Sequence, residues 1–225
     1  MSFKSIAVDG PSGAGKSTLA KMLAEALGYL YVDTGAVYRT LGLFAYQNGV
    51  EPTDAAAVTA ILDRARIELR HGDDGYQHTY LDGADVSHDI RRPEISKYAS
   101  AVSAIPEVRA FLLDMQRDLA RTHNVIMDGR DIGTVVLPDA AVKIFLTASA
   151  EERARRRHKE LLERGHDTDF ETVLHDIEKR DHDDSTRSAA PLKQAEDAIL
   201  VDTTGISLEE SLQVLLQTIG GKLDS

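Results

Sequence analysis

Residues 10–17 combine glycines, a lysine and a hydroxyl group at a spacing that could hold a phosphate. The segment reads GPSGAGKS and matches the pattern G-x-x-x-x-G-K-[ST] of phosphate-binding loops, whose backbone N–H groups surround anionic oxygens. Glycines allow this because no Cβ obstructs the approach, and the N-terminus of a following helix adds a favourable dipole. We therefore expect Lys16 to contact the β- and γ-phosphates of a nucleotide and Ser17 to bind Mg²⁺. An ordinary glycine-rich turn is the alternative, which the complete motif disfavours.

A carboxylate on the metal side of such a site could come from Asp128, which ends the apolar segment of VIMDGRD. If that segment is a strand beside the first one, Asp128 would lie near Ser17 and share the metal. An aspartate that caps the turn after a strand is an equally reasonable explanation.

Arginines are concentrated in RARRRHKELLERG, residues 153–165. Arg153, Arg156 and Arg157 follow i, i+3, i+4 spacing, so they share one helical face and could close over a triphosphate. The alternative is a solvated helix, in which Glu152 pairs with Arg156 on the surface.

Further charged residues are spaced for one face or placed at strand ends. Arg180, Asp184 and Arg187 lie at i, i+4 and i+7, which suits ribose hydroxyls and phosphate together. From spacing alone, a solvated helix held by surface ion pairs is the better explanation. Arg39 and Arg130 each follow a predicted strand, at the edge where open α/β sheets bind ligands.

Short apolar runs alternate with helix-period segments, a pattern that predicts a parallel sheet flanked by helices. One helix is expected over 16–27 with Gly28 as its stop, and Pro106 suits the first turn of another. Capping-box spacing predicts helix starts at Ser149, Thr168 and Ser207. The predicted strands lie in SIAVDG, LYVDTG, NVIMDG, VKIFLTA and AILVDTTG.

Two regions interrupt the alternation. Residues 66–90 contain the turn signals GDDG and DG with no helix between them, which predicts a small β-rich insertion. Residues 151–187 are a long charged helical stretch interrupted at Gly165, which predicts a helical hairpin projecting from the sheet edge.

Composition excludes several classes of protein. The 225 residues carry a net charge of −11, which argues against binding nucleic acid or anionic membrane through bulk charge. Cysteine is absent, so a thiolate metal site and a cysteine nucleophile are excluded, and a reducing, cytoplasmic location fits. No apolar run in the chain is long enough to be a signal peptide or a membrane span.

The segments GPSGAGKST, DTGAVYR, DGRDIGT and KRDHDDSTRSAAPL, in this order, resemble the bacterial cytidylate kinases nearly end to end. These nucleoside monophosphate kinases phosphorylate CMP and dCMP from ATP. The resemblance implies an α/β P-loop kinase fold, a parallel sheet flanked by helices, with a small β-rich insertion and a helical lid. It implies a single kinase domain over 1–225: a core of about 1–35, 106–150 and 190–225, a monophosphate-binding region of about 36–105 and a lid of about 151–187.

Carried over by position, the resemblance assigns site residues. Those expected to contact the monophosphate are Thr34, Arg39, Ser100, Arg109, Arg130, Asp131, Arg180, Asp184 and Arg187. Those expected to bind ATP are Gly10, Pro11, Ser12, Gly13, Ala14, Gly15, Lys16, Ser17, Thr18, Arg153 and Arg157. The catalytic set is Lys16, Arg130, Arg180 and Arg187, with Ser17 and Asp128 on the metal.

Two of these residues match one edge of cytosine. Asp131 could accept a hydrogen bond from the N4 amine, and Arg109 could donate to N3 or O2. Uracil reverses the pattern, so CMP and dCMP should be preferred over UMP. The alternative is that Asp131 only pairs with Arg130 or a lid arginine and shapes the loop.

The expected reaction is direct in-line transfer of a phosphoryl group from ATP, with Mg²⁺ and without a covalent intermediate. We expect the protein to act as a monomer. Kinases for UMP, dTMP or a metabolite such as shikimate share the first motif and stay open as alternatives, as does a non-catalytic nucleotide-binding module. A GTPase switch is disfavoured, because its N-K-x-D motif needs an Asn-Lys pair that the chain lacks.

Overall fold

The structure is a computed structural model that describes residues 3–72 and 77–223. It divides the chain into two compact units, described separately below. The first unit comprises Met1–Leu30 with His123–Ser225, and the second comprises Tyr31–Thr122.

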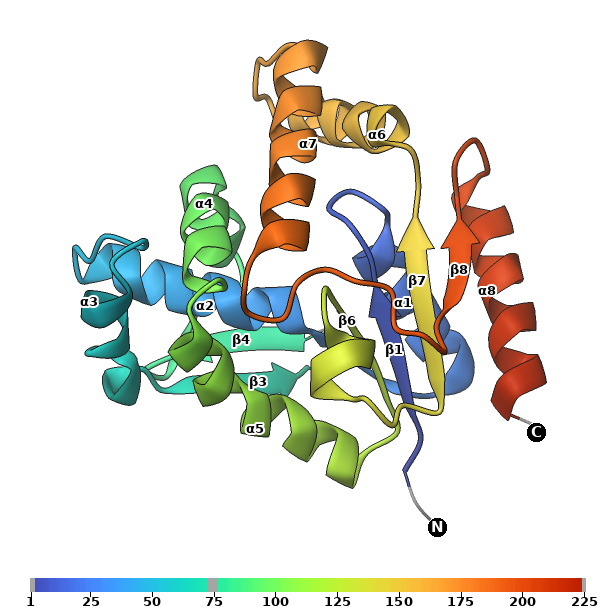
Figure 1. The fold of residues 1–225 in the computed structure, drawn as a ribbon, viewed down its shortest axis with the longest axis horizontal. Coiled ribbons are helices and arrows are strands. Elements are labelled where there is room, and N and C mark those ends of the chain that lie inside the picture. Colours follow the sequence, from blue (N-terminus) through green and yellow to red (C-terminus); the bar gives the residue numbers. More distant parts are fainter. Residues whose placement is uncertain (1–2, 73–76, 224–225) are drawn as a thin grey trace. The chain divides into compact units, whose positions relative to one another are not determined.

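A parallel sheet forms the centre of the first unit (Figure 1). Its strand order is β2-β6-β1-β7-β8, and β1 pairs in parallel with both β6 and β7, as β7 does with β8. The chain passes from the first unit to the second within β2, whose Leu30 donates its N–H to the Asn124 carbonyl at 2.8 Å. The strands are β1 (Ser5–Asp9), β2 (Leu30–Asp33), β6 (Val125–Gly129), β7 (Val142–Thr147) and β8 (Ile199–Asp202). The predicted parallel sheet and all five of its strands are confirmed.

The central position of β1 follows from its composition. Ile6, Ala7 and Val8 are fully buried, as expected of a parallel strand that is covered on both faces. At the end of this strand the chain passes so close to β7 that a Cβ on Gly10 would lie 1.9 Å from the Leu146 carbonyl oxygen. Only glycine fits there, which is a structural reason for the first residue of the phosphate-loop motif.

Most helix boundaries of the first unit agree with the capping signals. The α1 helix (Lys16–Leu27) ends at Gly28 in the left-handed conformation, as predicted. The Ser149 side chain caps α6 (Ala150–Glu163), and Ser207 and Glu210 exchange hydrogen bonds at the start of α8 (Leu208–Leu223). The prediction for α7 (Phe170–Thr186) was wrong by one residue. Its N-cap is Asp169, not Thr168, because the Asp169 carboxylate accepts both the N–H and the hydroxyl hydrogen of Thr172.

Helices α6 and α7 form the predicted helical hairpin, which we call the lid hairpin (Figure 1). Gly165, in a left-handed conformation, lies just beyond the end of α6. The buried core between the two helices is small and consists of Ala154, Val173 and Ile177. The α8 helix packs against α1 and β7 on another part of the same unit.

The second unit contains the predicted β-rich insertion. Strand β4 pairs in antiparallel fashion with β3 and with β5, and the β4–β5 turn consists of Asp82 and Gly83, both with positive φ, as a two-residue hairpin requires. The predicted GDDG turn lies largely outside the described residues. The elements of this unit are α2 (Thr34–Gln47), α3 (Ala55–Thr59), a 3₁₀ turn (Leu62–Arg64), β3 (Ile67–His71), β4 (Gln77–Leu81), β5 (Ala84–Asp85), a 3₁₀ turn (Asp89–Arg91), α4 (Pro93–Val102) and α5 (Pro106–Thr122). Over residues 3–72 and 77–223, no helix has both the length and the apolar character needed to cross a membrane.

Candidate active site

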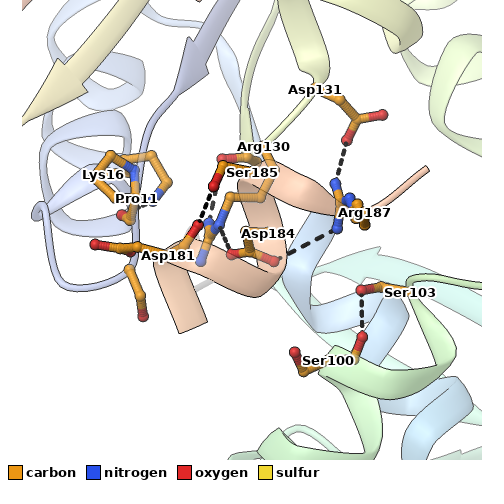
Figure 2. Close-up of polar contacts among 12 residues, drawn as sticks. Pro11, Lys16, Ser100, Ser103, Arg130, Asp131, Asp181, Asp184, Ser185 and Arg187 are labelled. Carbon is orange, nitrogen blue, oxygen red and sulfur yellow. Dashed lines mark hydrogen bonds and ion pairs between the residues drawn. The ribbon is translucent and has the colours of Figure 1, made fainter. Parts of the chain in front are cut away.

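The phosphate loop connects β1 to α1, the strand–loop–helix context that the motif requires. Its glycines Gly10, Gly13 and Gly15 all have positive φ. Lys16 begins α1 and is buried, and its Nζ donates a hydrogen bond to the Pro11 carbonyl at 2.7 Å (Figure 2). The lysine therefore folds back over its own loop, where a phosphate held by the loop would lie against it.

The electrostatic surroundings of Lys16 are suited to an anion. Its pKa lies well below the usual value of a lysine, because burial disfavours the charged form and Arg130 and Arg180 repel it. Asp128 and Asp9 act in the opposite direction without restoring the usual pKa. A phosphate would add the negative charge that this cluster of cations lacks.

Ser17 and Asp128 lie together, as predicted for a shared metal. The Ser17 hydroxyl donates to the Asp128 carboxylate at 2.9 Å, and the β1–β6 register that pairs Val8 with Asp128 brings the two residues together. Hydroxyl and carboxylate oxygens are the donors that Mg²⁺ prefers. Among the described residues no cluster of three His, Cys, Asp or Glu could hold a metal alone. Mg²⁺ in nucleotide sites usually binds through one or two protein side chains plus water and phosphate oxygens, so Ser17 and Asp128 are compatible with Mg²⁺.

An arginine–carboxylate cluster joins the loop after β6 to the C-terminal end of α7 (Figure 2). Arg130 Nε lies 2.8 Å from Asp184 Oδ2, and Arg187 lies 3.6 Å from the other oxygen of Asp184. The second guanidinium nitrogen of Arg187 lies 3.9 Å from Asp131 and donates to the Ala190 carbonyl at 2.7 Å. These residues come from two distant parts of the sequence, and the structure brings them together within the first unit.

Asp184 is the central anion of this cluster. Burial by itself would raise its pKa, but the neighbouring charges of Arg130, Arg180 and Arg187 and the hydrogen bond from Arg130 outweigh burial and hold the pKa below its usual range. On the face predicted from i, i+4, i+7 spacing, Asp184 is thus buried and paired with Arg130, which spacing alone did not indicate.

The lid arginines differ in their surroundings. Arg153 is buried, donates to the Ser12 and Ala148 carbonyls, each at 2.9 Å, and pairs with Asp181 at 2.6 Å. It therefore ties the phosphate loop to both helices of the lid hairpin. Arg157 pairs with Glu160 at 2.7 Å on the surface of α6. Their predicted contacts with ATP stay predictions.

The Glu152–Arg156 pair, weighed as a surface alternative, is present at 3.1 Å. Arg156 also donates to the Thr203 carbonyl at 2.8 Å, which attaches the start of the lid hairpin to the segment after β8.

The second unit holds four predicted substrate residues. Thr34 is buried at the start of α2, and one turn later Arg39 pairs with Asp33 at 2.8 Å. The other two are connected through Ser103. The Ser100 carbonyl accepts the Ser103 hydroxyl at 2.8 Å (Figure 2), and Arg109 donates to the Ser103 carbonyl at 2.9 Å. The Arg109 guanidinium lies 5.2 Å from the ring centroid of Tyr38, within cation–π range.

Several residues near the predicted site were not singled out from the sequence. Asp9, Asp33 and Asp181 each bind a predicted site residue or its loop. Asp9 and Asp33 had a signal, since both end predicted strands at the edge where ligands bind. For Asp181 there was no signal in the sequence other than its position in a charged helix.

A buried lysine in a strand–loop–helix phosphate motif, together with a charged lid on a parallel sheet, defines the class of P-loop phosphotransferases. The sequence model of the cytidylate kinase family matches residues 6–220. Cytidylate kinase of Caldicellulosiruptor bescii is 54% identical over 94% of this chain and 93% of its own, and that of Carboxydothermus hydrogenoformans is 50% identical over 97% and 98%. The chain belongs to the cytidylate kinase family, which confirms the resemblance.

The fold has parallels among solved structures. The crystal structure of an uncharacterized protein from Eubacterium ventriosum has a TM-score of 0.53 at 13% identity, covering 96% of this chain and 98% of that one. This likeness concerns the fold alone.

Proposed function

We propose that the protein transfers the γ-phosphoryl group of ATP to CMP and dCMP. Membership of the cytidylate kinase family supports this assignment, as does the phosphate loop. The observation that supports it most is the cluster in which Asp184 pairs with Arg130, whose charge acts on Lys16, and with Arg187. Such a cluster offers two guanidinium groups for an anionic acceptor, which a loop that only binds ATP would not need.

On the donor side, the loop amides and Lys16 would bind the β- and γ-phosphates. Ser17 and Asp128 would hold Mg²⁺, which supplies charge neutralisation to the phosphate oxygens. The hydrogen bond between these two side chains holds the Ser17 hydroxyl oxygen and the Asp128 carboxylate close together without the nucleotide. Lys16 starts from a lowered pKa, so the phosphate charge would favour its protonated form.

On the acceptor side, the phosphate of a monophosphate has a second pKa near ~6 and is largely dianionic at neutral pH. It can attack in line without a general base, so the work of the protein is positioning and charge neutralisation. Arg130, Arg180 and Arg187 would offset the repulsion between the two anions. Thr34, Arg39, Ser100 and Arg109 of the second unit are proposed to bind the monophosphate as well.

Asp131 is proposed to read the base. Its buried carboxylate lies 3.9 Å from Arg187 and would accept from the N4 amine of cytosine, whereas the O4 atom of uracil would face it acceptor to acceptor. A site built to hydrogen-bond a substrate group can reject an analogue lacking it by up to ~10⁴-fold.

The test is ADP production from ATP and Mg²⁺ with a panel of CMP, dCMP, UMP, dTMP and shikimate. CMP and dCMP should react fastest, and equal rates across the panel would contradict the proposal. Lys16→Ala should lower kcat by at least ~100-fold without lowering Tm, the scale of one lost electrostatic stabiliser. Lys159→Ala, on the exposed face of α6, is the matched control and should keep the parent rate.

A further inference from the structure

Asp9, the last residue of β1, lies outside the phosphate-loop motif and yet holds a different segment of the site. The residue is 4% exposed. One carboxylate oxygen accepts the N–H of Ile132 at 2.8 Å and the other accepts the N–H of Gly133 at 2.7 Å. Both amides follow directly after Arg130 and Asp131, so one buried side chain holds the backbone of the loop that carries two proposed substrate residues.

The same loop is held on its other sides. It contains a π-helical turn (Ile132–Val136) that follows Asp131. The Asp131 carbonyl accepts the N–H groups of Val135 and Val136 at 2.9 and 3.1 Å. A Cβ on Gly133 would lie 3.2 Å from Lys143 Cδ and 3.4 Å from Asp9 Oδ2, so the turn rests directly on β1 and β7. Lys143 is itself fixed by Asp197 at 2.8 Å.

A carboxylate is a costly group to bury at this place. The pKa of Asp9 is raised to about 6: burial is the main cause and the charge of Asp131 adds to it, while the two backbone N–H bonds and Lys16 act in the opposite direction. An apolar side chain would avoid this cost but would leave two buried N–H groups without acceptors. Among side chains of this size, only a carboxylate offers a separate accepting oxygen to each of the two N–H groups.

We propose that Asp9 is a positioning residue for the acceptor nucleotide: by accepting the Ile132 and Gly133 amides it fixes the turn that aims Arg130 and Asp131. This inference rests on the proposed roles of those two residues. Asp9 does not touch the substrate in this role, and its loss should affect the acceptor more than ATP.

The first test is Asp9→Asn, which keeps the shape but replaces one of the two accepting oxygens with an NH₂ donor that faces a backbone N–H. We expect kcat/KM for CMP to fall at least tenfold while KM for ATP stays within threefold. Val8→Ala, a buried change one residue earlier in β1, is the matched control for lost stability. It should lower Tm yet leave the CMP and ATP parameters within threefold of the parent. Equal losses for CMP and ATP in Asp9→Asn, or a CMP-selective loss in Val8→Ala, would overturn the proposal.

The second test needs no substrate, so it separates this inference from the proposed function. Amide hydrogen exchange at Ile132 and Gly133, measured by NMR relative to Ile126 in β6, should speed up at least tenfold in Asp9→Asn and not in Val8→Ala. Unchanged exchange would refute the positioning role even if CMP is phosphorylated. If Asp9→Asn does not fold, Gly133→Ala displaces the same turn and should reproduce the CMP-selective loss; a uniform loss there would overturn the proposal.

Discussion

Replacing Asp184 by Asn tests the arginine cluster most directly, because it removes the charge that holds two guanidinium groups and keeps the side-chain shape. The lost Arg130–Asp184 contact is a charge-assisted hydrogen bond of 2.8 Å between side chains that are 19% and 8% exposed. Such bonds contribute about 1.5–3 kcal/mol, and partial exposure of Arg130 argues against the 3–5 kcal/mol seen for fully buried pairs. We take about 2–3 kcal/mol, which corresponds to a ~30- to 150-fold lower kcat/KM for CMP.

The assay is ADP production at saturating ATP with varied CMP, beside a thermal melt of each variant. Asp183→Asn is the matched control, because it removes one negative charge from the same turn of α7 at an exposed position. It should keep kcat/KM within about twofold. A fivefold or smaller loss in Asp184→Asn, or an equal loss in both variants, would refute the reasoning that Asp184 orients Arg130 for the acceptor.

Three further predictions concern other parts of the molecule. Asp131→Ala should lower the CMP to UMP ratio of kcat/KM at least about tenfold, and a uniform loss on both substrates would assign base reading elsewhere. Because the pKa of Asp9 is raised from 3.8 to about 6, its contribution to the free energy of unfolding is present below pH 3.8 and lost above pH 6. The parent should therefore lose about 2 kcal/mol relative to Asp9→Asn between pH 4 and 7 in urea titrations, and parallel curves would contradict this. The lid hairpin has a small apolar core, so its amides over 153–187 should exchange faster without nucleotides than with both bound; equal exchange would exclude lid closure.

The sequence by itself determined the elements whose information is local. The strand, the phosphate loop and α1 are continuous in the chain, so the apolar run, the spacing of Gly10, Lys16 and Ser17 and the stop at Gly28 are readable directly. The β-rich insertion was readable for the same reason, since the Asp82-Gly83 turn permits the positive φ values of a tight hairpin. The one cap placed wrongly, Thr168, had a competing acceptor immediately beside it, and spacing does not rank neighbouring acceptors.

Tertiary structure decided which charged side chains meet. Spacing placed Arg180, Asp184 and Arg187 on one face of a helix, but a helical face has no partner until another segment packs against it. Only the folded chain shows that the partner of Asp184 is Arg130, 54 residues away in the sequence. Likewise, Arg153 and Arg157 look alike in a charged helix, and packing alone buries the first against the Ser12 carbonyl and leaves the second paired on the surface. Asp9 is the clearest case: its chemistry depends on the Ile132 and Gly133 amides, which reach it only because β1 and β6 are neighbours in the sheet, and no local pattern encodes that adjacency.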